Sequence, residues 1–285
     1  MDYTIRRLKA DDYPLVSGMN TGIENDYIVQ AFEHLIKEDV LYGLFIDDHL
    51  VSLGGYSLYA ENYAMLGRVR SDIRYRGKDL ATKLMSHIIK EALEDMRIQW
   101  IGANTQENNL SARRVLEKLG LTPFTTLHGA VAKNIEMLKT GAPSWHRIED
   151  LSRKKEWLDQ LYIQPGRLFP YECYYVFPAT EKLFKDDDVE QWHFYENDSQ
   201  TRCLITKLDR KGYQYLHVVY PWSDFMQQEG LWETVSKDYV NLLQHTSSME
   251  NDTYIWMDLT KEEADMLPEN HDFKLPSPWI LHEIR

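Results

Sequence analysis

The clearest periodic pattern in the chain lies between residues 79 and 96. Apolar residues recur there every three or four positions, and charged residues such as Lys83, Lys90 and Glu94 occupy positions between them. Because an α-helix turns once every 3.6 residues, such positions form one continuous stripe along the helix. The pattern therefore predicts an amphipathic helix whose buried stripe consists of Leu80, Ala81, Leu84, Met85, Ile88, Ile89, Ala92, Leu93 and Met96.

Apolar runs and turn signals around this helix predict a mixed layer of strands and helices. The runs at 41–46 and 50–59, separated by Asp47-Asp48-His49, are typical of a hairpin. Gly120 is well placed to end a helix that begins near Asn109. Further strands are expected near 3–8, 64–73, 99–103, 123–127 and 129–135, and further helices near 11–19 and 25–38. The predicted fold class is α/β, a mixed sheet flanked by helices.

The second half of the sequence repeats the first loosely. Gly141 and Pro143 interrupt the pattern around 138–146, which indicates a boundary between a domain of residues 1–138 and one of residues 139–285. The interval from Arg76 to Trp100 equals that from Gly230 to Tyr254, which favours a degenerate duplication. Expected elements are helices at 150–161 and 231–244, strands at 190–196, 201–208, 213–220, 254–259 and 279–284, and a capping box at 260–263.

The composition of the chain argues against several classes of function. The 285 residues carry a formal net charge of −13, which argues against a nucleic-acid or anionic-membrane surface. The negative charge is compatible with a cationic substrate such as an amine, and also with a charge that only keeps the protein soluble. Cys173 and Cys203 form no disulfide framework or C-x-x-C motif, so two buried thiols and no metal site are expected. The charged N-terminus and the lack of a long apolar run predict a cytoplasmic protein.

The junction between the strand at 64–73 and the helix at 79–96 carries the most informative chemistry. It reads Tyr75-Arg76-Gly77-Lys78 and leads directly into the helix. The turn and the first helical residues offer unbonded N–H groups, and the helix dipole adds partial positive charge at the same place. This junction therefore predicts binding of a phosphate-bearing ligand.

Two motifs give this junction a family resemblance. The register Arg76-Gly77-Lys78-Asp79-Leu80-Ala81 is similar to an Arg-x-x-Gly-x-Gly/Ala signature, and Asn109-Leu-Ser-Ala112 with Glu117-Lys118-Leu119-Gly120-Leu121 is similar to a second. Together they resemble the GNAT superfamily of acyl-CoA N-acyltransferases over residues 3–136. The resemblance implies acetyl-CoA as donor, an amine as acceptor and tandem GNAT-like domains. The second domain lacks the phosphate motif and is expected to be degenerate and without coenzyme A.

The resemblance also implies a set of binding residues. Backbone N–H groups of 77–82 would hold the pyrophosphate, and the preceding strand would bond the pantetheine arm. Asn109 is at least as well explained as a helix N-cap, and Arg113 as a solvated helix residue. The expected cofactor-binding residues are Val69, Ser71, Arg76, Gly77, Lys78, Leu80, Ala81, Thr82, Asn104, Asn109 and Arg113.

Two residues depart from the family pattern. Asp79 replaces the middle glycine; it is expected to stabilise the helix as a cap-like residue, at the cost of a carboxylate beside the pyrophosphate unless Lys78 or Lys83 offsets it. Leu116 occupies the place of a tyrosine that in many members protonates the departing thiolate.

The catalytic base is not fixed by the motifs. Glu61 is the candidate, and Tyr63, Asp72 and a water held by Asn104 are alternatives. The sequence thus predicts an N-acetyltransferase acting on a small amine or an exposed amino group. The alternative, favoured by Asp79 and Leu116, is a non-catalytic acyl-CoA-binding or regulatory module.

The segment 163–179 is dense in aromatic residues and proline. Such a stretch favours packing between the domains over a wall of the acceptor site.

Overall fold

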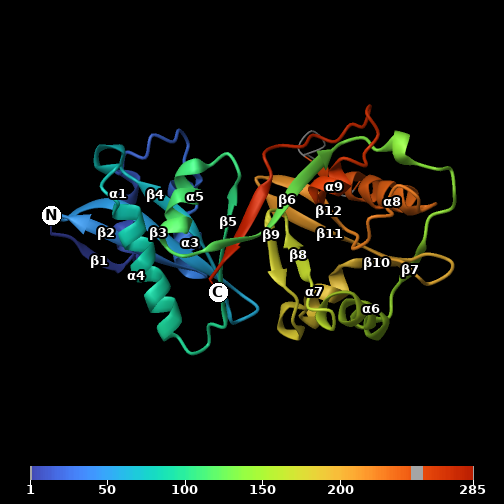
Figure 1. Cartoon of the computed structure of the whole chain (residues 1–285), viewed down its shortest axis with the longest axis horizontal. Coiled ribbons are helices and arrows are strands. Elements are labelled where there is room, and N and C mark those ends of the chain that lie inside the picture. Colours follow the sequence, from blue (N-terminus) through green and yellow to red (C-terminus); the bar gives the residue numbers. More distant parts are fainter. Residues whose placement is uncertain (1, 245–252, 285) are drawn as a thin grey trace. The chain divides into compact units, whose positions relative to one another are not determined.

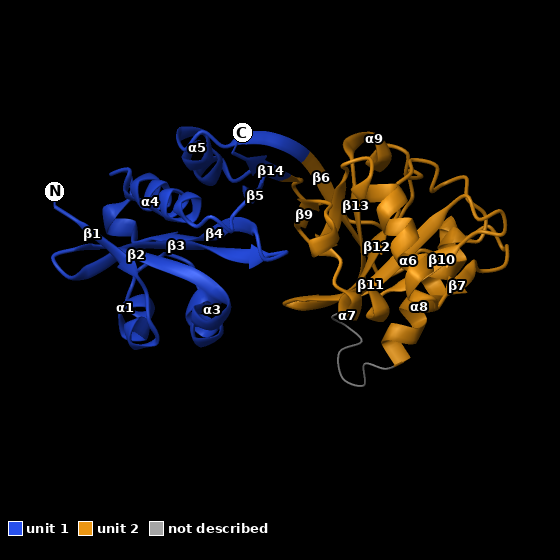
Figure 2. Ribbon diagram, turned by 90° about the horizontal axis from the view of Figure 1, so that it is seen from below, with its two compact units in different colours: residues 1–125, 280–285 blue, residues 126–279 orange. Residues whose placement is uncertain are grey.

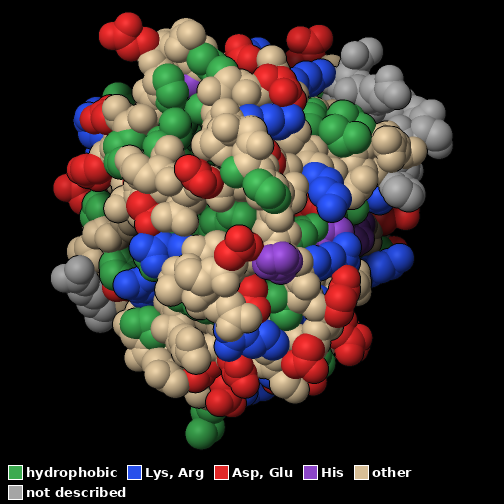
Figure 3. Space-filling view, turned by 90° about the vertical axis from the view of Figure 1, so that its right-hand side faces the viewer, with side chains coloured by type: hydrophobic (Ala, Val, Ile, Leu, Met, Phe, Trp, Pro, Cys, Tyr) green, Lys and Arg blue, Asp and Glu red, His purple; other side chains and the backbone are tan. Residues whose placement is uncertain are grey.

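The computed structural model describes residues 2–244 and 253–284. Its contacts divide the chain into unit 1, Met1–Thr125 with Ile280–Arg285, and unit 2, Thr126–Trp279 (Figure 2). No helix among the described residues combines the length and the apolar character needed to span a bilayer. On the face shown in Figure 3, acidic and basic side chains are interspersed rather than separated into fields of one sign.

Unit 1 is built on one mixed sheet in the order β1-β2-β3-β4-β5-β14 (Figure 1). Strands β1 to β4 are antiparallel neighbours, whereas β4 and β5 run parallel, with α4 as the connection between them. The strands are β1 (Thr4–Arg7), β2 (Asp39–Ile46), β3 (His49–Tyr59), β4 (Tyr63–Ser71), β5 (Trp100–Gln106) and β14 (Trp279–Glu283).

Helices cover both faces of this sheet (Figure 2). Alternate residues of β2 point to opposite faces, so Leu44 packs in the core under α4 and α5, whereas Phe45 packs under α1 to α3. Helix α4 buries Leu84, Met85 and Ile88 against the strands. The helices are α1 (Tyr13–Ser17), α2 (Tyr27–Gln30), α3 (Phe32–Glu38), α4 (Leu80–Glu94) and α5 (Leu110–Lys118).

Unit 2 has a sheet of the same plan in the order β6-β13-β12-β11-β10-β7. Strands β10, β11 and β12 are antiparallel neighbours, and β12 runs parallel to β13 with α8 between them in sequence. The strands are β6 (Thr122–Ala132), β7 (His146–Ile148), β10 (His193–Glu196), β11 (Cys203–Lys211), β12 (Tyr213–Val219) and β13 (Thr253–Leu259), and the helices are α6 (Leu151–Leu158), α7 (Asp186–Gln191), α8 (Leu231–Gln244) and α9 (Lys261–Ala264).

The two faces of this second sheet are covered differently. Trp232 and Val235 of α8 pack on one face with residues of β12 and β13. The opposite face lies under a separate two-stranded hairpin, β8 (Leu168–Glu172) and β9 (Tyr175–Pro178), where Cys173 packs with Tyr215 and Trp256. Each unit is therefore a mixed sheet with helices against it, which confirms the predicted fold class.

Several predicted elements differ from the structure. The strands expected at 123–127 and 129–135 form one continuous strand, β6, and the helix α7 was not predicted. Leu93 and Met96 are exposed: Ala92 is the last buried residue of the α4 stripe, and Met96 lies beyond the end of the helix at Glu94. The aromatic residues of 163–179 pack inside unit 2, where the Phe169 ring contacts the rings of Tyr162, Phe184 and Trp192.

The backbone of β2 leaves no room for a side chain at Gly55 of β3. A Cβ atom there would lie 2.1 Å from the Val40 carbonyl oxygen. We expect Gly55→Ala to lower the free energy of unfolding by about 1–3 kcal/mol, because the backbone must move to relieve the clash. Its register partner Gly67 has open space around the same position, so Gly67→Ala is the matched control and should change stability by less than about 0.5 kcal/mol. Urea titration of both variants measures the difference, and equal effects would contradict the packing argument.

Candidate functional site

The main feature of unit 1 is the parting of its two central parallel strands. Strands β4 and β5 pair from Tyr63 opposite Trp100 to Leu66 opposite Ala103. Beyond that point β4 continues to Ser71 and β5 to Gln106, and in the part of the chain that is described no further residue of β4 pairs with one of β5. We call the parted ends of β4 and β5 the slot, because strands that separate in this way allow an extended, amide-bearing chain to bond to one of them as if it were another strand.

A β-bulge in β4 lies in the parted segment. The pairing of β3 with β4 shifts register between Leu53 and Gly55, and Arg68 adopts a left-handed φ of 62°. A bulge inserts an extra residue and turns the side chains that follow it. It therefore sets which backbone groups of residues 67–71 face the slot.

The two arginines of the bulge are held by acidic residues. Arg68 Nε donates to Asp39 Oδ2 at 2.9 Å, and Arg70 donates to both carboxylate oxygens of Asp26 at 2.7 and 2.9 Å. The half-exposed ring of Tyr27 lies under both guanidinium groups, at 5.9 and 5.3 Å. These ion pairs were missed from the sequence, because their partners are 29 and 44 residues apart along the chain.

The turn after β4 is anchored by the buried Asp72. Its carboxylate accepts hydrogen bonds from the backbone N–H of Arg74 and Asn20 at 2.9 and 3.2 Å and from the Arg74 guanidinium at 2.6 and 2.9 Å. The bonds from Arg74 hold the pKa of this carboxyl far below its usual range. Asp72 thus fixes the path of the turn, and a carboxylate held so firmly in its charged form is a weak base.

Backbone N–H groups gather directly after this turn. Gly77 and Asp79 adopt left-handed φ values of 77° and 60°, and α4 begins at Leu80. Within the described chain, the N–H groups of residues 77–82 make no hydrogen bond. Arg76 donates to the Thr21 carbonyl at 2.6 Å, which ties the turn to the segment before α2. The start of α4 therefore presents several N–H donors and its positive dipole end to one place.

Asp79 does not act as the predicted cap. Its side chain makes no hydrogen bond to the helix N–H groups; instead it accepts from Thr82 Oγ1 at 2.9 Å and from Lys118 Nζ at 2.6 Å. The bond from Lys118 lowers the pKa of this exposed carboxyl, so Lys118 rather than Lys78 pairs with its charge. The left-handed backbone explains why glycine suits this position, and aspartate is among the few other residues that tolerate it.

The remaining predicted binding residues fall into two groups. Val69, Ser71 and Asn104 lie on the parted ends of β4 and β5, and the Ser71 hydroxyl lies 3.1 Å from that of Ser52. Asn109 is the N-cap of α5 and accepts from Ala112 N–H at 3.2 Å, while Arg113 donates to the Glu107 carbonyl at 3.0 Å. Lys78, Leu80, Ala81 and Thr82 line the start of α4, with Leu80 buried and Lys78 over the Tyr75 ring.

The predicted base lies away from this set. Glu61 is an exposed turn residue with a φ of 67°, between β3 and β4. Tyr63 begins β4 at the same end and is buried. The strand rise separates these residues from Val69 by roughly 20 Å along β4. Leu116 is buried in the core under α4.

The corresponding place in unit 2 is closed in two ways. Strand β12 pairs with β13 as far as Val218 and ends at Val219, so these strands do not part. The start of α8 is covered by residues 140–145: Glu233 accepts from the N–H groups of Thr140 and Gly141 at 2.5 and 2.6 Å. The segment predicted as a linker is thus packed over the N-terminus of this helix.

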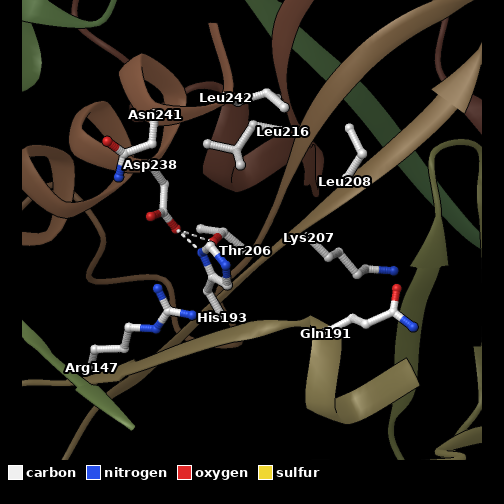
Figure 4. Close-up of a pocket in the computed structure, with 10 residues that line it drawn as sticks. All are labelled: Arg147, Gln191, His193, Thr206, Lys207, Leu208, Leu216, Asp238, Asn241 and Leu242. Carbon is white, nitrogen blue, oxygen red and sulfur yellow. Dashed lines mark hydrogen bonds and ion pairs between the residues drawn. The ribbon is translucent and has the colours of Figure 1, made fainter. Parts of the chain in front are cut away.

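Unit 2 instead holds a cavity of about 490 Å³ beside the second half of α8 (Figure 4). The buried Asp238 lies in its wall and accepts hydrogen bonds from His193 Nδ1 at 3.1 Å, Tyr195 OH at 2.6 Å and the Thr206 hydroxyl. Burial acts to raise the pKa of this carboxyl, but the three hydrogen bonds outweigh it and lower the pKa. This cavity lies away from the start of α8, so it is not the counterpart of the slot in unit 1.

Comparison with known proteins agrees with the geometry of unit 1. Residues 3–121 match the acetyltransferase (GNAT) family. This segment is a GNAT domain. The match contains β4, the turn, α4, β5 and α5, which are the elements that form the slot and the N–H cluster.

Solved structures extend the likeness of fold to unit 2. A GCN5-related N-acetyltransferase from Sphaerobacter thermophilus superposes with a TM-score of 0.61 at 14% identity, covering 99% of this chain and 96% of its own. A protein from Thermoplasma acidophilum described as an acetyltransferase gives 0.58 at 14% identity, covering 99% of both chains. The sequence matches none of the curated proteins with which it was compared. At this identity the likeness establishes the fold, and it includes both GNAT-like units.

The left-handed backbone of Asp79 generates a stability prediction. We expect Asp79→Gly to keep or raise the free energy of unfolding, because glycine adopts a φ of 60° without strain. Asp79→Ala should be about 1 kcal/mol less stable than the glycine variant. Lys118→Ala removes the exposed ion pair alone and should change stability by less than about 1 kcal/mol. Chemical denaturation of the three variants measures this order, and a glycine variant as unstable as the alanine variant would contradict it.

Proposed function

We propose that unit 1 binds acetyl-CoA and transfers its acetyl group to an amine. The observation that carries this proposal is the parting of β4 from β5 directly before a turn whose N–H groups converge at the start of α4. One feature suits an extended amide-bearing arm and the other suits a pyrophosphate. Coenzyme A contains these two parts in that order, and membership of residues 3–121 in the GNAT family agrees with it.

Each part of the cofactor has a proposed partner. The N–H groups of 77–82 would bind the pyrophosphate oxygens, with the dipole of the 15-residue helix α4 favouring the negative charge. Backbone groups of β4 around Val69 and Ser71 would bond the pantetheine amides, and Asn104 lies across the slot on β5. The N–H of Val69 would then polarise the thioester carbonyl on which negative charge develops.

Proton transfer is proposed to involve water. Among the described residues, the carboxylates of Asp26, Asp39 and Asp72 contact β4 or its turn, and each pairs with an arginine. Leu116 supplies no acid at the place of the family tyrosine. We therefore propose that water removes the amine proton and also protonates the coenzyme A thiolate. Glu61 lies at the other end of β4 and takes no part in this scheme.

The binding proposal is tested by a matched pair of charge reversals on one helix. Lys78→Glu places a carboxylate beside the N–H cluster, so we expect it to weaken acetyl-CoA binding at least tenfold. Lys90→Glu makes the same charge change at the exposed far end of α4 and should leave the affinity for acetyl-CoA unchanged. Titration calorimetry measures both. Absence of binding to the unaltered protein, or equal weakening by both changes, would refute the assignment.

Turnover separates an enzyme from a binding module. With acetyl-CoA and a panel of polyamines, aminoglycosides and amino acids, we expect amine-dependent release of free thiol. Because no unpaired carboxylate is assigned as base, kcat/KM should rise with pH in step with the pKa of the amine itself. A protein that binds acetyl-CoA but releases no thiol with any of these amines would favour the non-catalytic module.

A further inference from the structure

The face of the unit 2 sheet under the β8–β9 hairpin carries polar side chains that the proposed reaction does not use. Cys173 and Tyr174 form the two-residue turn of this hairpin, and Tyr174 adopts a left-handed φ of 75°. Such turns favour positive φ values. The turn directs Cys173 into the protein, where its side chain is fully buried.

Three potential metal ligands meet at this place. The Cys173 thiol, the Asp209 carboxylate of β11 and the His217 imidazole of β12 offer ligand atoms that all lie within 4.8 Å of one another. The Cys173 N–H donates to Asp209 Oδ2 at 2.6 Å and so holds the hairpin turn on β11. The three side chains come from three different strands or turns, and two of them are fully buried.

One atom of this cluster lacks a partner. His217 Nε2 lies 2.8 Å from Asp258 Oδ2 of β13, which fixes the proton on Nε2 in the neutral ring. Nδ1 is then a bare acceptor, and it is buried without a hydrogen-bond partner among the residues described. Leaving such an atom unsatisfied destabilises the folded protein. A metal ion beside Nδ1 would remove this destabilisation.

We propose that Cys173, Asp209 and His217 bind a zinc ion. Zinc favours this mixture of sulfur, nitrogen and oxygen ligands, and a carboxylate that orients the second nitrogen of a ligating histidine, as Asp258 does here, is a recurrent part of such sites. Around a tetrahedral zinc ion, ligand atoms are roughly 3.3–3.8 Å apart. Side-chain rotations that move these atoms by about an ångström would bring the set into that range.

The charges near the cluster agree with a divalent cation. The buried Lys207 donates from Nζ to the Tyr171 carbonyl and lies over the rings of Phe169, Tyr171 and Trp192. The ammonium of Lys207 and the carboxylates of Asp209 and Asp258 together carry one net negative charge. A zinc ion that displaces the thiol proton of Cys173 would bring the group to neutrality, which favours burial.

The three side chains would fill three of the four positions around a tetrahedral zinc ion, and the burial of Cys173 and His217 makes the site structural rather than catalytic. Cys173 and His217 have no exposed surface, so no substrate reaches them in this structure. Burial also argues against the rival interpretation, in which His217 activates Cys173 as a nucleophile. The bound ion would instead join the β8–β9 hairpin to β11 and β12.

The test uses the full chain purified without an affinity tag. We expect about one zinc ion per chain by elemental analysis. Replacement by Co²⁺ should give the sulfur-to-metal charge-transfer absorption that marks a thiolate ligand. Cys173→Ala should lose this absorption and any rise in melting temperature on adding zinc. Cys203→Ala, which removes the other buried thiol outside the cluster, should keep both.

The spectrum of the unaltered protein decides the outcome even if Cys173→Ala does not fold. A folded protein that takes up no Co²⁺, or takes it up without thiolate absorption, would overturn the proposal. So would zinc content that is equal in the unaltered protein and a folded Cys173→Ala variant. Transfer of an acetyl group from acetyl-CoA to Cys173 in metal-free protein would favour the nucleophile instead.

Discussion

The parallel pairing of β4 with β5, and its end at Leu66 and Ala103, is the constraint on which the candidate site depends. Hydrogen bonds hold the two strands together over their first residues. The bulge at Arg68 and the ion pairs of Arg68 and Arg70 keep the rest of β4 on a separate path. Asp72 then fixes the turn that leads from the end of β4 to the N–H groups at the start of α4. The end of the strand pairing, the bulge and the turn follow one another along the chain, and together they form the candidate site.

Unit 2 has the same strand order, but its two parallel strands do not part. Its strands β12 and β13 stay paired to the end, and residues 140–145 occupy the start of α8. Its buried polar groups lie elsewhere, around Asp238 on one face of the sheet and around His217 on the other. The two units therefore share strand order but place their charged side chains at different positions. Shared topology gives unit 2 no equivalent of the slot.

Local patterns predicted much of this structure. The helix at 231–244, the hairpin of β2 and β3 and the N-cap at Asn109 were expected from periodicity and turn residues, which depend on neighbours a few positions away. Local patterns did not predict the left-handed backbone at Asp79 or the distance of Glu61 from the slot. Both depend on where the strands of the whole sheet end and on the path that the chain takes between them. Cys173, Asp209 and His217 share no spacing motif, so only folding brings them together.

The position of β14 has a consequence for synthesis of the protein. Residues 279–283 complete the sheet of unit 1 beside β5, yet unit 2 occupies the sequence between Thr126 and Trp279. During translation, β5 therefore keeps an open edge until residues 107–278 have been made and β14 follows. Open strand edges pair readily with other chains, and contacts so distant in sequence form slowly. Folding of unit 2 would thus precede closure of unit 1, and unit 1 expressed alone to residue 125 would lack a strand.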